Sequence, residues 1–262
     1  MSGRLQGKIA LVTGAGGAIG GAIARRFAAE GAAVCVADIN LEGAEKTVTD
    51  IQVAGGKAVA CPLDVTIPAQ CERAVQLAAE RFGGPTVLVN VAAGPTSDGT
   101  VVDLPLEAWT KEITTNLTGY FLMAKYAIPR IREAGGGAVI NIASQLGQIG
   151  VPRRSAYCSS KAAIIELTRC MAIDHASENI RVNSISPGAI NTPRSMWRYK
   201  TEEEAIADRG RFYLTRRPGR VDEIASGAVY LASDEASFCT GMDLLIDGGY
   251  LAFKGTTADL PA

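Results

Sequence analysis

Residues 9–21 read IALVTGAGGAIGG, an apolar run that leads directly into a glycine-rich turn. Ile9 to Val12 have the continuous apolar character of a buried strand, and an alanine-rich helical segment follows the turn as far as Glu30. Glycines allow a sharp turn and a close approach of the backbone to a ligand. Free backbone N–H groups and the positive end of a helix dipole favour an anion there. The stretch therefore predicts a phosphate cradle, and an ordinary tight turn between strand and helix is the alternative.

The second strand, Ala33 to Ala37, ends at Asp38, 18 residues after Gly20. Dinucleotide-binding folds place at about this distance the acid that binds the hydroxyls of the adenosine ribose. A carboxylate in this position repels the 2′-phosphate of NADP, so Asp38 predicts NAD as the cofactor. An aspartate that merely forms a turn is the alternative.

Strands and helical segments alternate along the rest of the chain. Further strands are expected at 57–61, 86–90, 138–143, 181–186 and 243–246, and helices at about 41–54, 68–82, 105–134 (broken near Gly119), after Tyr157 and near 221–232. This alternation is typical of parallel βαβ units with right-handed crossovers. Because no repeat, linker or composition shift interrupts it, we expect an α/β fold: one domain over residues 1–262, with a Rossmann-type doubly wound parallel sheet flanked by helices.

Composition excludes several classes of function. Of the 262 residues, 47% are hydrophobic and 20% charged, and the formal net charge of −1 argues against binding to nucleic acid or to an anionic membrane. The six cysteines form no CxxC pair and lie in apolar segments, so buried reduced thiols are expected rather than disulfides. The single His175 has no second imidazole with which to bind a metal. Without a signal peptide or membrane-length apolar run, a cytoplasmic protein is expected.

The residues that suggest catalysis lie in the stretch 144–161, SQLGQIGVPRRSAYCSSK. Tyr157 and Lys161 are four residues apart, which places both side chains on one face of a helix. A nearby ammonium lowers the pKa of a phenol, and such a tyrosine can exchange a proton with a substrate oxygen. Ser144 ends a buried strand, so its hydroxyl can lie beside the phenol. Tyr250 and Lys254 share the spacing, but they follow a turn signal and lack such a serine, so we interpret them as accidental.

Residues 189–215 are too long for a simple connection and contain aromatic and basic side chains, which predicts a lid over the site. Four arginines flank the expected substrate pocket: Arg153, Arg154, Arg194 and Arg198. They are interpreted as surface or subunit-contact residues, with recognition of an anionic substrate as the alternative.

The whole chain resembles the short-chain dehydrogenase/reductase family. The resemblance is carried by six motifs in order: TGAGGAIG at 13–20, NLTG at 116–119, NIAS at 141–144, YCSSK at 157–161, PGAINT at 187–192 and DGG at 247–249. It differs from the usual family pattern in having Ala18 in place of a glycine and Val91 in place of an asparagine. A methyl group at residue 18 would crowd a pyrophosphate if φ were positive there.

The resemblance implies roles for particular residues. Tyr157 would be the general acid/base, Lys161 would bind the nicotinamide ribose and tune the phenol, Ser144 would hold the substrate oxygen, and Asn116 would support a proton relay. The implied NAD-binding residues are Gly14, Gly17, Ile19, Gly20, Asp38, Asp64, Val65, Asn90, Tyr157, Lys161, Pro187, Gly188, Ile190 and Thr192. The family also implies a homotetramer.

The expected function is hydride transfer between NAD and a secondary alcohol or its ketone, on a small polar metabolite such as a sugar, polyol or hydroxy acid. A 3-oxoacyl-thioester reductase is the alternative within the family. Two other classes compete: a Rossmann methyltransferase, which leaves Tyr157 and Lys161 unexplained, and a nucleotide-binding protein without dehydrogenase activity.

Overall fold

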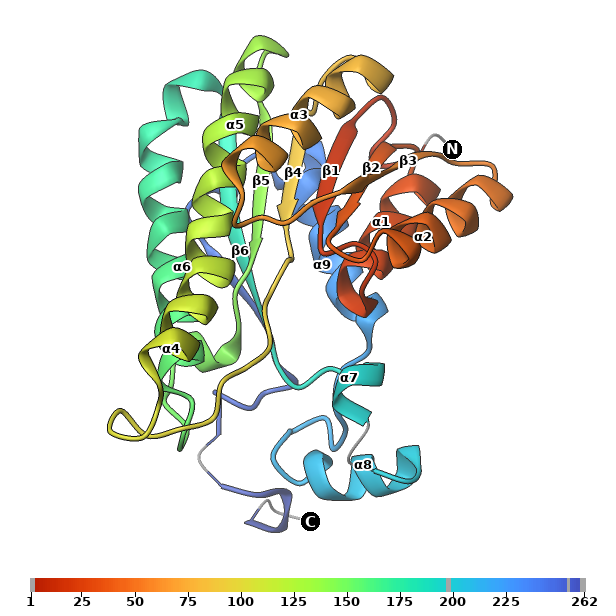
Figure 1. Ribbon diagram of the computed structural model, residues 1–262. Helices are drawn as coiled ribbons and strands as arrows, with labels where there is room; N and C mark the ends of the chain where they lie inside the picture. Colours follow the sequence, from red (N-terminus) through yellow and green to blue (C-terminus); the bar gives the residue numbers. More distant parts are fainter. Residues whose placement is uncertain (1–2, 197–198, 254, 260–262) are drawn as a thin grey trace.

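The computed structural model describes residues 3–196, 199–253 and 255–259. Within these residues, seven strands form one parallel sheet in the order β3-β2-β1-β4-β5-β6-β7 (Figure 1). The strands are β1 Ile9–Thr13, β2 Ala33–Asp38, β3 Lys57–Pro62, β4 Val87–Asn90, β5 Gly137–Ile142, β6 Ile180–Pro187 and β7 Asp243–Ile246. The expected Rossmann-type α/β sheet is thus confirmed.

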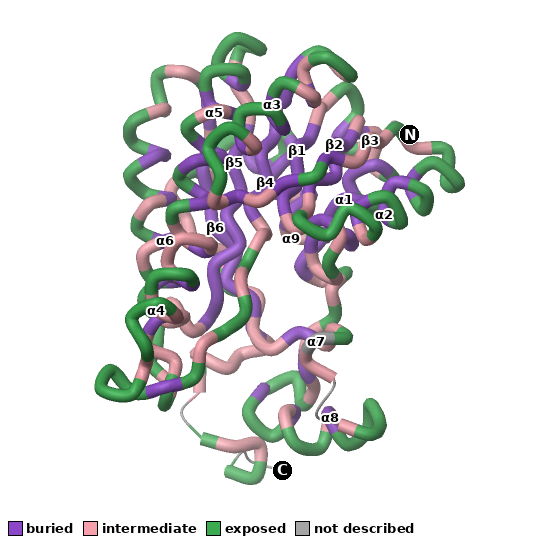
Figure 2. The backbone as a smooth tube through the Cα atoms, viewed as in Figure 1, coloured by how far each residue is buried: buried purple, intermediate pink, exposed green. Residues whose placement is uncertain are grey.

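Helices cover both faces of the sheet (Figure 1). One face carries α1 Ala18–Ala29, α2 Leu41–Val53 and α9 Val221–Ala232, and the other carries α3 Pro68–Phe82, α5 Gly119–Glu133 and α6 Ser155–Asp174. Side chains alternate between the two apolar layers: Ala10 and Val12 of β1 pack on the first face and Leu11 on the second. Because the strands are buried on both faces, they are almost continuously apolar in sequence, and Figure 2 shows them as the buried centre of the molecule.

The order of the strands fixes where a ligand can bind. The chain moves outward from β1 to β3, then returns to place β4 on the other side of β1. The loops after β1 and β4 therefore separate, and in sheets of this kind the crevice at the carboxyl ends of the strands is the ligand site. The predicted cofactor residues of the loops and the catalytic Ser144 lie at strand ends or in the segments that follow them at this edge, whereas Asn116, Tyr157 and Lys161 lie on helical segments.

The long helical region predicted at 105–134 is interrupted as expected, and the interruption is a π-helical turn. α4 Leu106–Ile113 passes into a π turn at Thr114–Thr118, and α5 starts at Gly119. A π turn contains one more residue per turn than an α-helix and is often found at functional sites. Asn116 lies in the middle of it.

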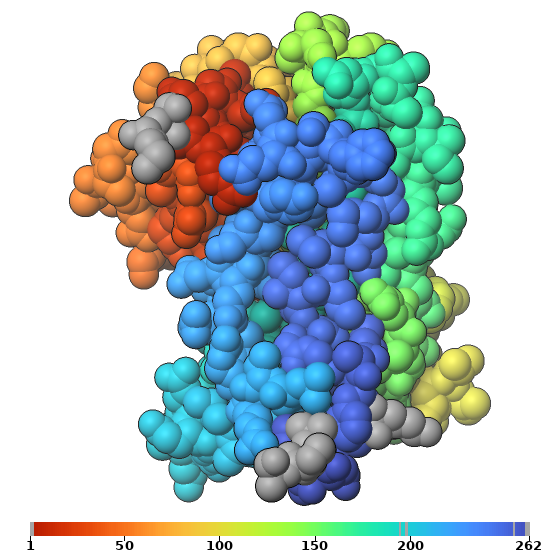
Figure 3. Space-filling model, turned by 180° about the vertical axis from the view of Figure 1, so that it is seen from behind, coloured from red at the N-terminus to blue at the C-terminus, as the bar shows by residue number. Residues whose placement is uncertain are grey.

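The segment 189–215 contains two helices, α7 Pro193–Met196 and α8 Glu202–Gly210, which lie beyond the carboxyl edge of the sheet (Figure 1). Figure 2 shows mostly exposed or half-buried backbone in this region. Seen from behind, α9 and the chain around β7 form the middle of the surface, between the N-terminal part and α6 (Figure 3).

The cysteines are free thiols, but the expectation that all are buried is wrong. Cys35, Cys61 and Cys71 are buried, Cys158 and Cys239 are half-buried, and Cys170 is exposed. Cys170 lies on the outer side of α6, where an apolar neighbourhood in sequence does not imply burial. Within the described ranges, no helix combines the length and apolar character that a membrane span requires.

Candidate active site

The glycine turn after β1 leaves the start of α1 open to a ligand. Gly14 has a φ of 63°, which favours glycine. The helix begins after Gly17 without a side-chain cap and without an acidic residue in its first turn. Its first N–H groups and dipole are therefore available to an anion such as a pyrophosphate. Ala18 is the first helical residue and is not among the residues with positive φ, so its methyl group causes no strain.

Asp38 is held at the end of β2 by two backbone N–H groups. Its Oδ2 accepts a hydrogen bond from Gly16 at 2.9 Å, and its Oδ1 accepts one from Asn40 at 2.8 Å. A Cβ on Gly16 would lie 3.1 Å from the Asp38 carboxyl carbon, so glycine permits this close approach. The carboxylate is half-buried and fixed beside the glycine turn, as the adenosine ribose of a dinucleotide requires.

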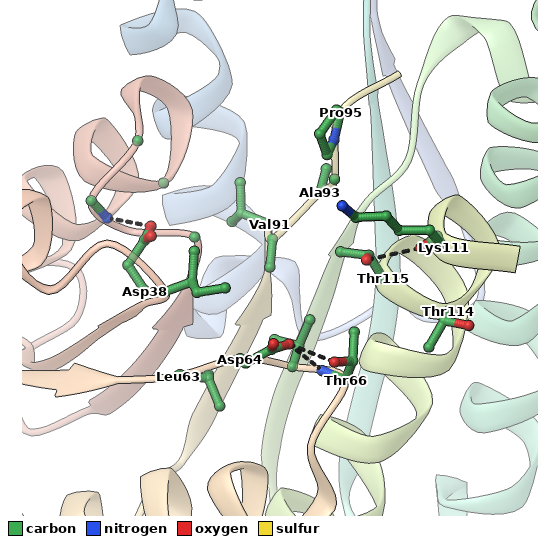
Figure 4. A pocket seen from close by; sticks show the side chains of 18 of the residues that line it. Asp38, Leu63, Asp64, Thr66, Val91, Ala93, Pro95, Lys111, Thr114 and Thr115 are labelled. Atoms are coloured by element: carbon green, nitrogen blue, oxygen red, sulfur yellow. Dashed lines mark hydrogen bonds between the residues drawn. The ribbon is translucent and has the colours of Figure 1, made fainter. Parts of the chain in front are cut away.

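A large cleft opens between these residues and helix α4. Its volume is about 1240 Å³. Figure 4 shows Asp38 on one wall and Lys111 of α4, with Thr115, on the opposite wall. Asp64 lies at the base of the cleft, where its Oδ1 accepts hydrogen bonds from the Thr66 backbone N–H (2.9 Å) and hydroxyl (2.7 Å). The predicted cofactor residues that line the cleft are Gly14, Gly17, Ile19, Gly20, Asp38, Asp64, Val65 and Thr192.

The segment after β4 forms the middle of the cleft. Residues 91–95 line it, and Thr13 Oγ1 accepts hydrogen bonds from the N–H groups of Val91 (3.0 Å) and Ala92 (3.2 Å). Asn90 is fully buried instead, and its Nδ2 donates to Asn141 Oδ1 of β5 at 2.9 Å. The Asn90 side chain therefore joins two strands, and its neighbours 91–95 face the ligand space.

Asn116 joins the loop after β4 to the helix that carries Tyr157. Its Oδ1 accepts a hydrogen bond from Gly94 N at 3.1 Å, and its Nδ2 donates to Ser160 Oγ at 3.2 Å. The Ser160 hydroxyl in turn donates to the Tyr157 carbonyl at 2.8 Å. The π turn thus brings Asn116 between two segments that the sequence places far apart.

Lys161 lies on α6, the catalytic helix that also carries Tyr157, and its side chain is buried. Its side chain is only 2% exposed, and its Nζ donates to the Ile142 carbonyl at 2.8 Å. The ammonium lies 5.5 Å from the ring centre of Tyr120 and 5.8 Å from that of Tyr157. Burial lowers the pKa of Lys161 to about 7, against the opposing effect of the Glu112 charge. The predicted Tyr157–Lys161 pair therefore lies on one helix. Because the pKa of Lys161 is lowered toward neutrality, nearby charges can change the protonation state of the lysine.

Ser144 follows β5 directly, at the carboxyl edge of the sheet. It is buried, and its Oγ accepts a hydrogen bond from Leu146 N at 3.1 Å. Its hydroxyl proton remains available for a further acceptor. Gln145 was not predicted from the sequence: its Nε2 donates to Tyr213 Oη at 3.3 Å, and Tyr213 Oη also accepts from Ala189 N at 2.8 Å. This bridge holds the strand end against the loop 187–192.

The loop that follows β6 begins at Pro187. Gly188 N donates to the Ile246 carbonyl at 2.9 Å, and Ile190 pairs with Gly219 in an isolated parallel bridge. Thr192 reaches the rim of the large cleft. The four predicted residues of this loop therefore lie at the carboxyl edge, next to Gln145 and Tyr213.

Two of the four flanking arginines contact the 94–100 loop. Arg153 forms an ion pair with Asp98 (Nε to Oδ1, 3.0 Å), and Arg154 Nη1 donates to the Ser97 carbonyl at 3.2 Å. These contacts favour the interpretation of both as structural residues. Only the backbone of Arg194 is described, and Arg198 lies outside the described residues.

The second tyrosine–lysine match differs from the first. Tyr250 lies in the turn after β7, where its ring centre is 5.3 Å from that of Tyr213, and Lys254 lies outside the described residues. Among the described residues, no three His, Cys, Asp or Glu side chains gather as ligands for a metal ion.

Sequence reasoning also missed Glu112 and Tyr120, both buried against the catalytic helix. The available signal was a charged residue at a position in α4 where the helical period points to the core.

Comparisons with known proteins agree with this arrangement. The family model described as enoyl-(acyl carrier protein) reductase matches residues 14–251. A 2,5-dichloro-2,5-cyclohexadiene-1,4-diol dehydrogenase of Sphingobium indicum is 39% identical over 95% of this chain and 98% of its own. A cyclohexanol dehydrogenase of an Acinetobacter strain is 37% identical (95% and 97% covered). A D-threitol dehydrogenase of Mycolicibacterium smegmatis is 38% identical (94% and 94%).

Two solved structures are similar over nearly their whole length. A protein described as a short-chain dehydrogenase/reductase from Burkholderia xenovorans has a TM-score of 0.88 at 40% identity, covering 96% of this chain and 99% of its own. A 7α-hydroxysteroid dehydrogenase, complexed with NADH and 7-oxoglycochenodeoxycholic acid, has a TM-score of 0.88 at 36% identity (94% and 95% covered).

Proposed function

The chain belongs to the short-chain dehydrogenase/reductase family, and from this premise we propose that it transfers a hydride between NAD and the carbinol carbon of a secondary alcohol. One observation carries the proposal: the buried ammonium of Lys161 is held 5.8 Å from the Tyr157 ring, at the edge of the sheet where the large cleft opens. A nucleotide-binding protein without catalysis has no use for a desolvated lysine beside a phenol.

In this proposal the residues of the chain move and hold a proton. The charged Lys161 favours the phenolate form of Tyr157, which accepts the hydroxyl proton of an alcohol as the carbinol hydrogen leaves. Ser144 donates a hydrogen bond to the substrate oxygen and so orients it. Asn116 keeps the loop after β4 and the catalytic helix in register through Gly94 and Ser160. A bound nicotinamide ring supplies the hydride acceptor or donor.

We further propose NAD rather than NADP, on the basis of Asp38. A 2′-phosphate next to this carboxylate would place like charges within a few ångströms, with a repulsion of about 4 kcal/mol for unit charges 4 Å apart at an effective dielectric near 20. Lys111, a cation on the cleft wall, lies on the opposite side from Asp38 (Figure 4), so it does not neutralise a phosphate at the Asp38 side.

For the substrate, we propose a small polyhydroxylated or cyclic secondary alcohol. The three curated relatives described above carry names for activity on a cyclic diol, a cyclic alcohol and a four-carbon polyol, respectively. With Arg153 and Arg154 engaged by the 94–100 loop, a neutral substrate fits better than an anion.

The deciding experiment is a screen of the purified enzyme for reduction of NAD, in which the absorbance of the reduced nicotinamide is monitored. The panel contains diols, cyclohexanols, tetritols, hydroxy acids and, in the reverse direction, 3-oxoacyl thioesters. We expect turnover with the first three groups. Turnover confined to acyl thioesters would replace the proposed substrate class, and NADH binding without any turnover would support a non-catalytic protein.

We also propose a homotetramer. β7 is one of the two edge strands of the sheet and carries the exposed Leu245, and Phe238, just before β7, is fully exposed. The C-terminal part of the chain around β7 forms the middle of the rear surface (Figure 3). An edge strand with exposed apolar side chains is suited to pairing with a second copy. Light scattering of the eluting protein would give the mass, and Phe238→Lys should shift it toward smaller species.

A further inference from the structure

Three charged side chains are buried among the described residues: Glu112, Lys161 and Asp247. Asp247 is accounted for, because its two carboxylate oxygens accept hydrogen bonds from Gly249 N (2.9 Å) and Leu251 N (2.8 Å) in the turn after β7. The other two have opposite charges and lie on helices that pack against each other, α4 and α6. A buried charge is costly unless it is paired or hydrogen-bonded, so the presence of both requires an explanation.

Glu112 is only half satisfied by its contacts. Its side chain is 1% exposed, and Oε2 accepts a hydrogen bond from Ser97 N at 2.9 Å. Oε1 is buried and has no hydrogen-bond partner in the structure. A glutamine would serve Ser97 equally well, so the hydrogen bond alone does not account for a negative charge at this position.

Among the described residues, the groups that act on Lys161 come from four elements, and one of these groups is negative. Tyr120 faces it from α5, Tyr157 from its own helix α6, and the Ile142 carbonyl from β5. Glu112 acts on it from α4 and raises the pKa of the lysine, whereas burial lowers it. The neighbouring phenols are neutral when protonated, so Glu112 is the charge that opposes the desolvation of the ammonium.

We propose that Glu112 is a positioning residue of the active site: its buried carboxylate is the counter-charge to the buried Lys161 ammonium across the packed helices α4 and α6, and its Oε2 anchors the 94–100 loop at Ser97. The role of the charged lysine rests on the proposed dehydrogenase function. The anchoring extends to the catalytic helix, because Arg154, immediately before α6, donates to the Ser97 carbonyl. The Ser97 backbone is therefore hydrogen-bonded on both sides: its N–H donates to Glu112 of α4, and its carbonyl accepts from Arg154 at the start of α6.

The two tasks can be separated with three variants. Glu112→Gln keeps an acceptor for Ser97 N and removes the charge, whereas Glu112→Ala removes both. Glu112→Asp keeps the charge on a shorter side chain. The matched control is Glu166→Gln, which removes an exposed carboxylate from Lys161's own helix, where solvent screens its charge.

The first measurement is the titration of the Lys161 Cε resonance in enzyme labelled with carbon-13 lysine, assigned with Lys161→Met and recorded without cofactor. The charge of Glu112 raises the pKa of Lys161, so its removal must lower it. We expect the midpoint in Glu112→Gln to fall by roughly one pH unit, and Glu112→Asp and Glu166→Gln to remain close to the wild type. Equal midpoints in Glu112→Gln and the wild type would overturn the counter-charge role. Because this measurement needs no turnover, it tests the counter-charge role even if the proposed dehydrogenase reaction is wrong.

The second measurement is hydrogen exchange of a peptide covering residues 94–100, in variants first checked for native circular dichroism. Glu112→Ala should exchange faster there, and Glu112→Gln should match the wild type. If Glu112→Ala leaves the loop as protected as before, the carboxylate does not anchor it.

Discussion

The two walls of the cleft are built in different ways. The cofactor wall, formed by the glycine turn, Asp38 and Asp64, relies on backbone N–H groups, which donate to Asp38 from Gly16 and Asn40 and to Asp64 from Thr66. The catalytic wall is formed by α4 and the start of the π turn, with α6 packed behind them, and buried side chains hold these elements together. Asn116 reaches residues 22 and 44 positions away, and Lys161 reaches a carbonyl 19 positions away.

This difference has an energetic consequence. Backbone donors keep their positions whatever the neighbouring side chains are, so the cofactor wall tolerates substitutions that avoid the glycines and Asp38. The groups that hold the catalytic wall in place, Glu112, Asn116 and Lys161, are desolvated, and electrostatic effects between such groups are larger than those at the surface. We therefore expect single substitutions to have their greatest effects on the catalytic wall.

The largest effect is expected for Tyr157→Phe, which removes one hydroxyl and leaves the ring to pack. Loss of a positioned acid/base costs roughly 10²–10⁴-fold in kcat, while NADH binding should persist because the cofactor wall is intact. Steady-state kinetics with fluorescence titration of NADH measures both. Tyr250→Phe, on the other tyrosine, should leave kcat nearly unchanged, and the reverse ranking of the two variants would contradict the assignment.

On the cofactor wall, Asp38→Ala should narrow the preference for NAD over NADP by roughly 10–100-fold, since a partly solvated charge repels less than the 4 kcal/mol given above. Most of the change should come from weaker use of NAD, because the ribose hydroxyls lose their acceptor. The measurement is kcat/KM for both cofactors with one substrate, and Asp50→Ala on the exposed face of α2 is the control. A wild-type enzyme that works better with NADP would reverse this interpretation.

A smaller effect is expected for Arg154→Ala, which removes the donor to the Ser97 carbonyl. The expected cost is about 1 kcal/mol in the free energy of unfolding, with KM raised equally for charged and neutral substrates because the loop, not an anion, has lost a partner. Denaturant titration and kinetics on a matched pair of substrates test this, with Arg130→Ala, which removes an exposed side chain of α5, as the control. A KM increase confined to the charged substrate would make Arg154 a substrate ligand.

The smallest effect concerns neither wall but the lid. Residues 191–215 should exchange their amide hydrogens more slowly when cofactor and a substrate analogue are added, as expected for a segment that closes over the site. A peptide from the C-terminal half of α3, which ends just before β4 and so lies toward the amino edge of the sheet, should be unaffected. Identical exchange of the lid in free and bound enzyme would remove its proposed role.

The sequence predicted the cofactor wall more fully than the catalytic wall, and the reason is physical. Continuous apolar strands and a glycine turn are local patterns, so β1, α1 and the position of Asp38 could be read from consecutive residues. The Tyr157–Lys161 spacing is also local. The partners of Lys161 and Ser97 cannot be identified from local patterns. Glu112 and Tyr120 come near Lys161, and Glu112 and Arg154 bond Ser97, only once α4, α5 and α6 have packed. The helices α7 and α8 were likewise not predicted within the lid.

The π turn also sets the angular register of the helix in which it lies. Glu112 and Tyr120 are eight residues apart, and at about 100° per residue an uninterrupted α-helix would turn them about 80° away from each other. Both nevertheless act on Lys161. The wider turn absorbs one residue, so the pair behaves as if seven apart, which is about two turns. The π turn is therefore equivalent to the insertion of one residue into the helix. It positions Asn116, while the residues before and after it keep the angular positions that direct Glu112 and Tyr120 toward Lys161. Deleting one residue from 114–118 would thus convert the π turn to α-helix and leave Glu112 and Tyr120 on the same side of the helix, both directed toward Lys161.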